Sequence, residues 1–292
     1  MTVSLVIPNW NGRHLIERNI SSWLAVGASE VIVVDDGSTD GSVVLLHDLR
    51  FKNKDLRIIE NKKNLGFARA VNRGVEASRG DIVVLLNTDV RPEPGLLDVV
   101  LPHFKNKNVF GVSFNEVRWS WGKGRWLNGF FEHGPGPQTK ETHITFWISG
   151  GSGVFRKSIW DALGGFDTIY HPFYWEDIDL SYRAAKRGYT LLWDPKARVE
   201  HEHEGTISKY FSRDYINFIQ ERNQLLFIWK NITSPHLIKE HVGAVVKRTV
   251  KSPGYLKVVL AALSHWFKIT SSRAKEKREA TISDEQIFAQ FK

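Results

Sequence analysis

The chain has 292 residues, 42% of them hydrophobic and 25% charged, which is enough to bury a sizeable core in a globular protein. It contains no cysteine, which excludes disulfides, thiolate zinc sites and cysteine nucleophiles. The net charge of +8 is uneven, because residues 235–292 hold eleven Lys or Arg and five Asp or Glu and so carry +6. This segment suits an anionic membrane surface or nucleic acid, or is a solvated helical face.

The first part of the chain alternates strand and helix signals, as βαβ units with a mainly parallel sheet do. Strands are predicted at 3–8, 31–35, 56–60 and 81–86, and helices up to about residue 25 and over 67–78. Three of these strands end in polar clusters, at Pro8–Asn11, Asp35–Ser38 and Asn87–Asp89. Because ligands bind beyond the carboxyl ends of strands in such sheets, the three clusters together predict a pocket.

Residues 91–150 are less regular and rich in Trp, Gly and Pro, which is typical of binding loops. The Trp residues at 119–126 are interpreted either as an acceptor platform or as a satellite core under a long loop. Beyond Gly150-Gly151, helices are predicted around 156–163 and 175–187, a strand at 190–193 and helical segments over 208–230. The glycine pair is expected to let backbone approach a bound sugar.

Two acidic motifs could supply a ligand for a divalent cation and a general base. Asp89 follows an apolar strand, where it could reach a divalent cation and a diphosphate. Glu176-Asp177 opens a helix after Tyr174 and Trp175, whose rings suit stacking on a sugar, and could supply a general base. An acidic first turn is also what any helix prefers, so a purely structural role stays open at this point.

Two histidines follow the strand of residues 190–193, in the order His201-Glu202-His203. The His-x-His spacing is a weak metal signal, since most single histidines are structural. Mn²⁺ accepts imidazole together with oxygen ligands, so either histidine could complete a cation site.

The sequence resembles the family 2 glycosyltransferases of the GT-A fold, particularly the bacterial rhamnosyltransferase-like branch. Four stretches carry the resemblance in the family's order, namely Val3–Asn11 with Val33–Asp40, Asn64–Gly74, Leu85–Val90, and Gly164 through Trp175–Leu180 to His201. The resemblance implies a Rossmann-like α/β fold, with a mixed, mainly parallel sheet flanked by helices and a C-terminal helical tail. It also implies inverting transfer by direct displacement.

The resemblance implies a role for each matching residue. Asp177 matches the catalytic base. Asp89 and His201 match ligands of Mn²⁺ or Mg²⁺, and His201 matches better than His203. Asn87 replaces the first acid of the family's Asp-x-Asp motif. The donor nucleotide is expected to contact Pro8, Trp10, Asp36, Asn64, Gly66, Asn72 and Asn87, and the sugars to contact Gly150, Gly151, Trp175 and Glu176.

The expected organisation is a catalytic domain over 1–230, with a nucleotide-binding half (1–90) and an acceptor half (91–230), and a basic amphipathic tail over 231–292. The tail contains an apolar helical pattern over 255–268 with basic flanks, which is typical of an interfacial helix or of a helix packed on protein. The 13-residue apolar run at 255–267 is too short to cross a bilayer, which takes about 20 residues. No secretory signal is recognised, so a cytoplasmic protein, peripheral on the inner face of the membrane, is expected.

The expected reaction moves a sugar from dTDP-rhamnose or a UDP-sugar to a glycan or lipid-linked glycan, in bacterial cell-surface polysaccharide assembly. One alternative is a nucleotidyltransferase that makes sugar nucleotides, although Pro8–Gly12 is no triphosphate-binding loop. The other alternative is a non-catalytic protein that binds carbohydrate or nucleic acid. Nucleic acid is not expected as a partner, because the tail lacks interleaved aromatic and basic residues.

Overall fold

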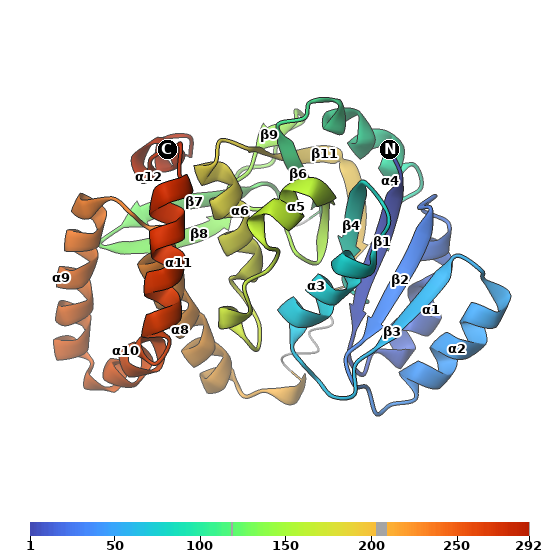
Figure 1. Cartoon of the computed structure of the whole chain (residues 1–292), viewed down its shortest axis with the longest axis horizontal. Helices are drawn as coiled ribbons and strands as arrows, with labels where there is room; N and C mark the ends of the chain where they lie inside the picture. Colours follow the sequence, from blue (N-terminus) through green and yellow to red (C-terminus); the bar gives the residue numbers. More distant parts are fainter. Residues whose placement is uncertain (118, 203–208, 292) are drawn as a thin grey trace.

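The computed structural model describes residues 1–117, 119–202 and 209–291 (Figure 1). The strands are β1 (Val3–Asn9), β2 (Glu30–Asp35), β3 (Leu56–Glu60), β4 (Ile82–Leu86), β5 (Val90–Pro92), β6 (Val109–Asn115), β7 (Gly122–Leu127), β8 (Phe130–Pro135), β9 (His143–Ile144), β10 (Ser152–Arg156) and β11 (Thr190–His201). The helices are α1 (Arg13–Leu24), α2 (Ser42–Lys52), α3 (Phe67–Ala77), α4 (Leu96–Val100), α5 (Lys157–Leu163), α6 (Glu176–Lys186), α8 (Arg213–Asn231), α9 (Pro235–Lys251), α10 (Leu256–Leu263), α11 (Trp266–Glu279) and α12 (Asp284–Ala289), with short 3₁₀ turns at Leu101–Lys105, Thr168–Tyr170 and Pro253–Tyr255.

The main sheet has the strand order β3-β2-β1-β4-β10-β6-β11-β5, with β9 beside β11, and β7 and β8 form a separate hairpin. The strands from β3 to β4 run parallel, whereas β10 runs antiparallel to both β4 and β6. The register pairs Asn9 with Asp35 and Asp35 with Glu60, so β1, β2 and β3 end at one level. The loops that follow these strands therefore start from a common edge.

Apolar side chains cover both faces of this sheet. Along β1, Leu5 and Ile7 belong to the core shared with α1, α2 and α4, while Val6 belongs to the core shared with α3, α5 and α6. This is the two-residue period of a strand buried on both sides. Each fully buried aliphatic side chain contributes about 1.5–3 kcal/mol, so the two cores provide most of the stabilisation that fixes the strand ends.

A third, aromatic core joins the β7–β8 hairpin to the C-terminal helices at the end of the molecule opposite β3 (Figure 1). Phe131 of β8 is fully buried, with its ring centroid 4.8 Å from that of Phe146 and 5.0 Å from that of Phe227 on α8. Ile287 and Phe288 of α12 belong to the same core. The last helices of the chain are therefore packed on the β7–β8 hairpin and α8.

The single helix expected over 255–268 is wrong, because α10 ends at Leu263 and α11 begins at Trp266. Both helices contact α8, and the turn between them lets each bury side chains there. Val258 and Ala262 of α10 and Ile269 of α11 are the buried residues. The apolar face expected from the spacing is mostly exposed instead, at Leu256, Leu260, Leu263 and Phe267.

Within residues 1–117, 119–202 and 209–291, no helix combines the length and the apolar character needed to cross a membrane.

Candidate active site

The loops after β1 and β2 are tied together by short polar bonds. Asn9 donates from Nδ2 to Asp35 Oδ2 at 2.8 Å, and the Ser38 hydroxyl accepts from the Asn11 backbone at 2.9 Å. Pro8 lies beside Val34 in the sheet, half-buried. This bonding fixes the edge at which the first two predicted clusters lie.

Trp10 is half-buried at the same edge and packs on Tyr210, with the ring centroids 4.6 Å apart. Tyr210 lies more than 190 residues further along the chain and is 51% exposed. The pair leaves an aromatic surface beside the predicted nucleotide-binding residues.

Asp36 organises the loop that leads from β3 into α3. Its buried carboxylate accepts hydrogen bonds from Asn61 Nδ2 at 2.6 Å and from the backbone N–H groups of Leu65 and Gly66 at 3.0 and 2.9 Å. Gly66 has a φ of +90°, and a Cβ there would lie 2.5 Å from His171 Nδ1, so glycine is required. The next candidate, Asn64, is exposed and accepts from the Gly66 N–H.

Asn72 on α3 faces the loop before α6. Its amide accepts from the Phe166 N–H at 2.9 Å and donates to the Phe166 carbonyl at 2.8 Å. These two bonds dock α3 on the Gly164–Asp167 segment, so a contact between Asn72 and a donor nucleotide stays a prediction.

Asp89 and His201 meet where β5 pairs with β11. His201 Nε2 lies 3.3 Å from Asp89 Oδ1, and His201 Nδ1 lies 2.8 Å from Glu116 Oε2. Burial disfavours the charged imidazole, but the hydrogen bonds with both carboxylates outweigh it and raise the pKa of His201 to about 9. The three side chains are 10–13% exposed, so they form a partly open polar cluster.

In the described part of the chain, no group of three or more His, Asp or Glu side chains has the arrangement of a complete metal site. His203, the second histidine that the sequence offers as a ligand, lies outside the described residues. Among the described residues, Asp89 and His201 with Glu116 therefore form only part of the ligand set that a divalent cation needs.

The Gly150-Gly151 turn connects the two acidic motifs. The Gly151 carbonyl accepts from the Asn87 N–H at 2.8 Å, and the Gly150 N–H donates to Asp177 Oδ2 at 3.2 Å. A Cβ on Gly151 would lie 2.3 Å from Asn87 Nδ2, so no larger residue fits without displacing Asn87. The end of β4 and the start of α6 thus converge on one turn.

The residues that lead into α6 have an uncommon backbone conformation. Tyr174 and Trp175 have φ angles of +70° and +79°. For a residue other than glycine, this backbone conformation costs about 1–3 kcal/mol of folding free energy. Asn223 of α8 offsets this cost, since its Nδ2 donates to the carbonyls of Tyr170, Phe173 and Tyr174 at 2.9–3.1 Å. Because α8 fixes this loop, the first turn of α6 is held in place.

Two adjacent carboxyl groups open α6. Burial raises the pKa of Asp177, and hydrogen bonds from Gly150 and Ile178 oppose the rise without cancelling it. Burial and the neighbouring charge of Asp177 raise the pKa of Glu176 further, well above its usual range. Glu176 is 6% exposed, and its Oε2 has no hydrogen-bond partner among the described residues. Of the two carboxyls, Glu176 is therefore the one whose pKa is raised more strongly.

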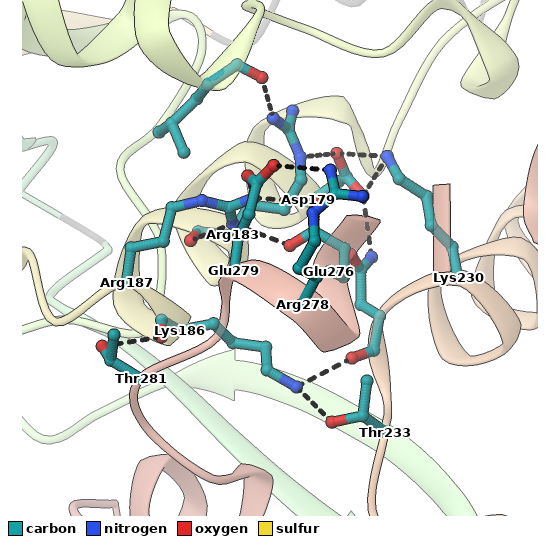
Figure 2. Close-up of polar contacts among 12 residues, drawn as sticks. Asp179, Arg183, Lys186, Arg187, Lys230, Thr233, Glu276, Arg278, Glu279 and Thr281 are labelled. Atoms are coloured by element: carbon teal, nitrogen blue, oxygen red, sulfur yellow. Dashed lines mark hydrogen bonds and ion pairs between the residues drawn. The ribbon is translucent and has the colours of Figure 1, made fainter. Parts of the chain in front are cut away.

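Asp179, two residues after Asp177 on α6, has different surroundings (Figure 2). It is fully buried and accepts from Lys230 Nζ, Arg183 Nε and the Tyr170 hydroxyl, each at 2.8 Å, and from Asn231 Nδ2 at 2.7 Å. Burial raises its pKa, but the charges of Lys230 and Arg183 outweigh burial and lower it. The surroundings of Asp179 therefore favour its ionised form, and its contacts anchor α6.

The far end of α6 is bound to the C-terminal helices. Lys186 and Asp284 of α12 form an ion pair at 2.8 Å with both side chains fully buried. Arg187 pairs with Glu276 of α11 at 2.7 Å, a contact visible in Figure 2. The tail therefore contributes to the support of the helix that carries Asp177.

A cavity of about 390 Å³ opens beside Asp177. Its wall comes from β8, the segment between β9 and β10, the start of α6 and α8, through His133, Trp147, Tyr174, Trp175, Asp177, Ile178, Gln220, Glu221 and Gln224. The Trp residues at 119–126 are interpreted from the sequence either as an acceptor platform or as a satellite core. Trp121 is buried in the aromatic core, and neither Trp119 nor Trp126 lines this cavity.

Sequence reasoning missed several residues of this site. Glu116 follows β6 without any motif, and it reaches His201 only because β6 and β11 are neighbours. Asn223, Gln220 and Gln224 lie on a helix whose spacing marks only an apolar face. The sequence signal that could have indicated Asn223 is its position as a polar residue on the buried side of α8.

Two solved glycosyltransferases have a similar fold. GalNAc-T7, solved with UDP, GalNAc and Mn²⁺, matches with a TM-score of 0.66 at 16% identity, over 87% of this chain and 57% of that one. The mannosyltransferase PcManGT of Pyrobaculum calidifontis, solved with GDP-Man and Mn²⁺, matches with a TM-score of 0.58 at 16% identity, over 99% and 85%. The GT-A fold expected from the sequence is confirmed.

Residues 4–163 match the model of glycosyl transferase family 2, and the chain belongs to that family. It is 30% identical over 217 residues to the pre-mycofactocin glycosyltransferase of Mycobacterium tuberculosis, over 72% of this chain and 45% of that protein. It is 26% identical over 208 residues to the N-acetylglucosaminyl-diphospho-decaprenol L-rhamnosyltransferase of the same organism, over 59% and 66%. The chain spans less than half the length of the first of these relatives.

Proposed function

We propose that this protein transfers a sugar from a nucleotide-diphosphate donor to an acceptor hydroxyl, with inversion at the anomeric carbon. The observation that carries the proposal is the Gly150-Gly151 turn, which bonds to Asn87 on one side and to Asp177 on the other. A leaving group held near Asn87 and a hydroxyl held near Asp177 would then lie on opposite sides of one reacting centre, as in-line displacement requires.

Asp177 is the general base in this proposal. Its carboxylate has no cation partner among the described residues and receives backbone N–H groups from Gly150 and Ile178. Its raised pKa makes it a better proton acceptor than an exposed Asp. Glu176 is proposed, with Trp175, to contact a sugar.

Asp89 and His201 are proposed to hold Mn²⁺ or Mg²⁺, as the Mn²⁺ in both similar structures suggests. The residues fit once a cation displaces the proton of His201 Nε2, because that nitrogen lies 3.3 Å from a carboxylate oxygen of Asp89 and Mn²⁺ accepts both ligand types. Glu116 bonds to the other nitrogen of His201 and orients the ring. When bound, the cation neutralises charge on the diphosphate leaving group.

The donor nucleotide is proposed to lie along the common strand edge, against Pro8, Trp10 and Asp36 and the Asn64–Asn72 segment. The donor itself is proposed to be dTDP-rhamnose or a UDP-sugar. The similarity to an L-rhamnosyltransferase favours the first, and the UDP in one similar structure favours the second.

The acceptor is proposed to be a glycan or a lipid-linked glycan, used in cell-surface polysaccharide assembly at the inner face of the membrane. An exposed apolar surface on α9, α10 and α11 supports this location, at Val242, Val246, Val250, Leu256, Leu260, Leu263, Trp266 and Phe267. Residues 241–275 hold seven Lys or Arg and no Asp or Glu, which suits anionic lipid. The tail of residues 231–292 is then a membrane-binding unit as well as a support for α6.

The donor and metal assignments are tested by thermal shift with a panel of nucleotide sugars and Mn²⁺. One dTDP- or UDP-sugar is expected to raise the Tm by mass action, and EDTA or Asp89→Asn is expected to remove the increase. Asp98→Asn, at an exposed acid of α4, is the matched control and should keep it. A shift that persists in EDTA would contradict the metal role, and no shift with any nucleotide sugar would contradict the donor class.

The membrane assignment is tested by sedimentation with phosphatidylglycerol vesicles. Replacing Leu260 and Phe267 by serine removes two side chains that are 56% and 89% exposed, so the bound fraction should fall. Val44→Ser alters an equally exposed residue on α2, and should leave binding unchanged. Equal sedimentation of all three proteins would end the proposal.

A further inference from the structure

The cavity beside Asp177 has a chemical character of its own. Its volume of about 390 Å³ lies near the lower end of the range for small-molecule sites, roughly 300–1,000 Å³. One monosaccharide unit suits this size better than a long oligosaccharide does. The question is which kind of sugar its walls accept.

Aromatic rings form one side of the cavity. The His133 ring meets Trp147 and Trp175 edge to face, at centroid distances of 5.4 and 5.2 Å and interplanar angles of 74° and 84°. Trp147 and Tyr174 are half-buried, so part of each ring remains accessible. Amphipathic rings of this kind pack against the C–H face of a pyranose while their polar edges stay in water.

Two amides and one carboxylate from α8 form another part of the wall. Gln220 is exposed, and Gln224 is half-buried with its Nε2 donating to the Phe131 carbonyl at 2.8 Å. An amide both donates and accepts, which matches the hydroxyl groups of a sugar. The third of these residues, Glu221, carries a negative charge.

No Lys or Arg lines the cavity within the described ranges, whereas Asp177 and Glu221 both do. Arg248, which does not line the cavity, pairs with Glu221, and its guanidinium stacks 4.1 Å from the centroid of the Tyr255 ring. A uronic acid or a phosphorylated ring would therefore place a second negative charge against Asp177 with no cation of the wall to offset it. Such a charge is costly at a partly desolvated site.

We propose that this cavity is the binding site for the reacting sugar of the acceptor, and that it selects an uncharged pyranose. Trp147 and Tyr174 supply the packing face, Gln220 and Gln224 supply hydrogen bonds, and the negative wall excludes acidic sugars. This inference rests on the proposed glycosyl transfer, because it takes Asp177 as the base that the acceptor hydroxyl must reach.

The test compares neutral p-nitrophenyl pyranosides (gluco, galacto, manno and rhamno) with p-nitrophenyl uronides, by ligand-observed NMR on the whole protein. At least one neutral glycoside is expected to bind, and the uronides are expected to bind at least tenfold more weakly. Uronides that bind as well as the neutral glycosides would overturn the inference, and so would the absence of binding by the whole panel.

Variants locate the binding. Trp147→Ala should weaken the neutral glycoside about tenfold or more, which corresponds to 1.4 kcal/mol. Gln220→Ala, at an exposed position, gives a second reading if Trp147→Ala does not fold. Trp266→Ala, at an exposed Trp outside the cavity, is the control and should bind normally. Equal binding by Gln220→Ala, Trp147→Ala and the control would refute this location.

A variant that binds uronides more tightly would show that charge, and not only packing, determines which sugars the cavity accepts. Glu221→Gln removes one negative charge from the wall and leaves Arg248 without that partner, so the uronide should bind several-fold better than it does to the unaltered protein. An unchanged preference would contradict the charge argument. Thermal shift by the donor with Mn²⁺ is measured on the same samples, so a failed donor site is distinguished from a failed acceptor cavity.

Discussion

Asp177 and Asp179 lie two residues apart on α6, yet their surroundings differ in almost every respect. Among the described residues, Asp177 borders the open cavity and receives only backbone N–H groups, whereas Asp179 is enclosed by Lys230, Arg183 and two uncharged donors. The pKa is raised at the first carboxyl and lowered at the second. The neighbours of these two identical side chains therefore make Asp177 suitable as a base and Asp179 suitable as a structural anchor.

The difference also shows how the support is divided between distant parts of the chain. Lys230 comes from α8, and α11 and α12 hold the last turn of α6 through Glu276 and Asp284. A charged network that encloses one side of α6 leaves the other side free for a cavity. The basic tail is therefore part of what positions the first turn of this helix.

The largest expected effect is on turnover, at Asp177. Asp177→Asn removes the proposed base while keeping the shape of the side chain, so kcat should fall by about 10²–10⁴-fold. Stability should not fall, because the carboxylate lost is one that burial disfavours. Transfer from the identified donor measures the first effect and urea unfolding the second. Near-normal turnover would exclude Asp177 as the base.

Asp179→Asn should show the opposite pattern. Removing the charge leaves Lys230 and Arg183 buried without their shared partner, which costs about 3–5 kcal/mol of unfolding free energy. The turnover of the molecules that remain folded should fall far less than in Asp177→Asn. Urea unfolding measures the stability. Titration with the donor counts the folded active sites, so that turnover can be expressed per folded molecule. Unchanged stability would show that the network is not an anchor.

The reach of the tail is tested at Asp284. Asp284→Asn breaks the fully buried pair with Lys186 and should lower the unfolding free energy by about 3–5 kcal/mol. Glu285→Gln, at the exposed neighbouring residue, should stay within about 0.5 kcal/mol of the parent. If the two variants unfolded alike, the C-terminal helices would be only loosely associated with α6.

Much of the fold was predictable, because strand periodicity and the polar strand ends are local properties of the sequence. The same local signals indicated Asp89, at the end of an apolar strand, and Glu176-Asp177, at a helix start. Glu116 and Asn223 were not predictable, since their partners lie 85 and about 50 residues away and depend on strand order. The break between α10 and α11 was missed because it follows from packing on α8, which helical spacing cannot encode.

The smallest expected effect is in the pH dependence of kcat and of stability, which gives the most detailed test of the comparison between Asp177 and Asp179. Asp177 must be ionised to accept a proton, and its pKa is raised above 3.8, so kcat should fall about tenfold per pH unit below a midpoint that lies above 3.8. Asp179 contributes in the other sense, because its pKa is lowered. Its stabilisation is fully present above 3.8 and is lost only as the pH falls through the lower native value.

Activity should therefore be lost at a higher pH than structure, with a window in which the protein is folded and inactive. Far-ultraviolet circular dichroism and kcat measured over the same pH series check this order. Glu176→Gln is the control, because the pKa of Glu176 is raised more strongly than that of Asp177, so the acid limb of kcat should keep its midpoint. If that limb moved down toward 3.8, the two carboxyls would share the proton, and the separate roles given to Glu176 and Asp177 would have to be merged.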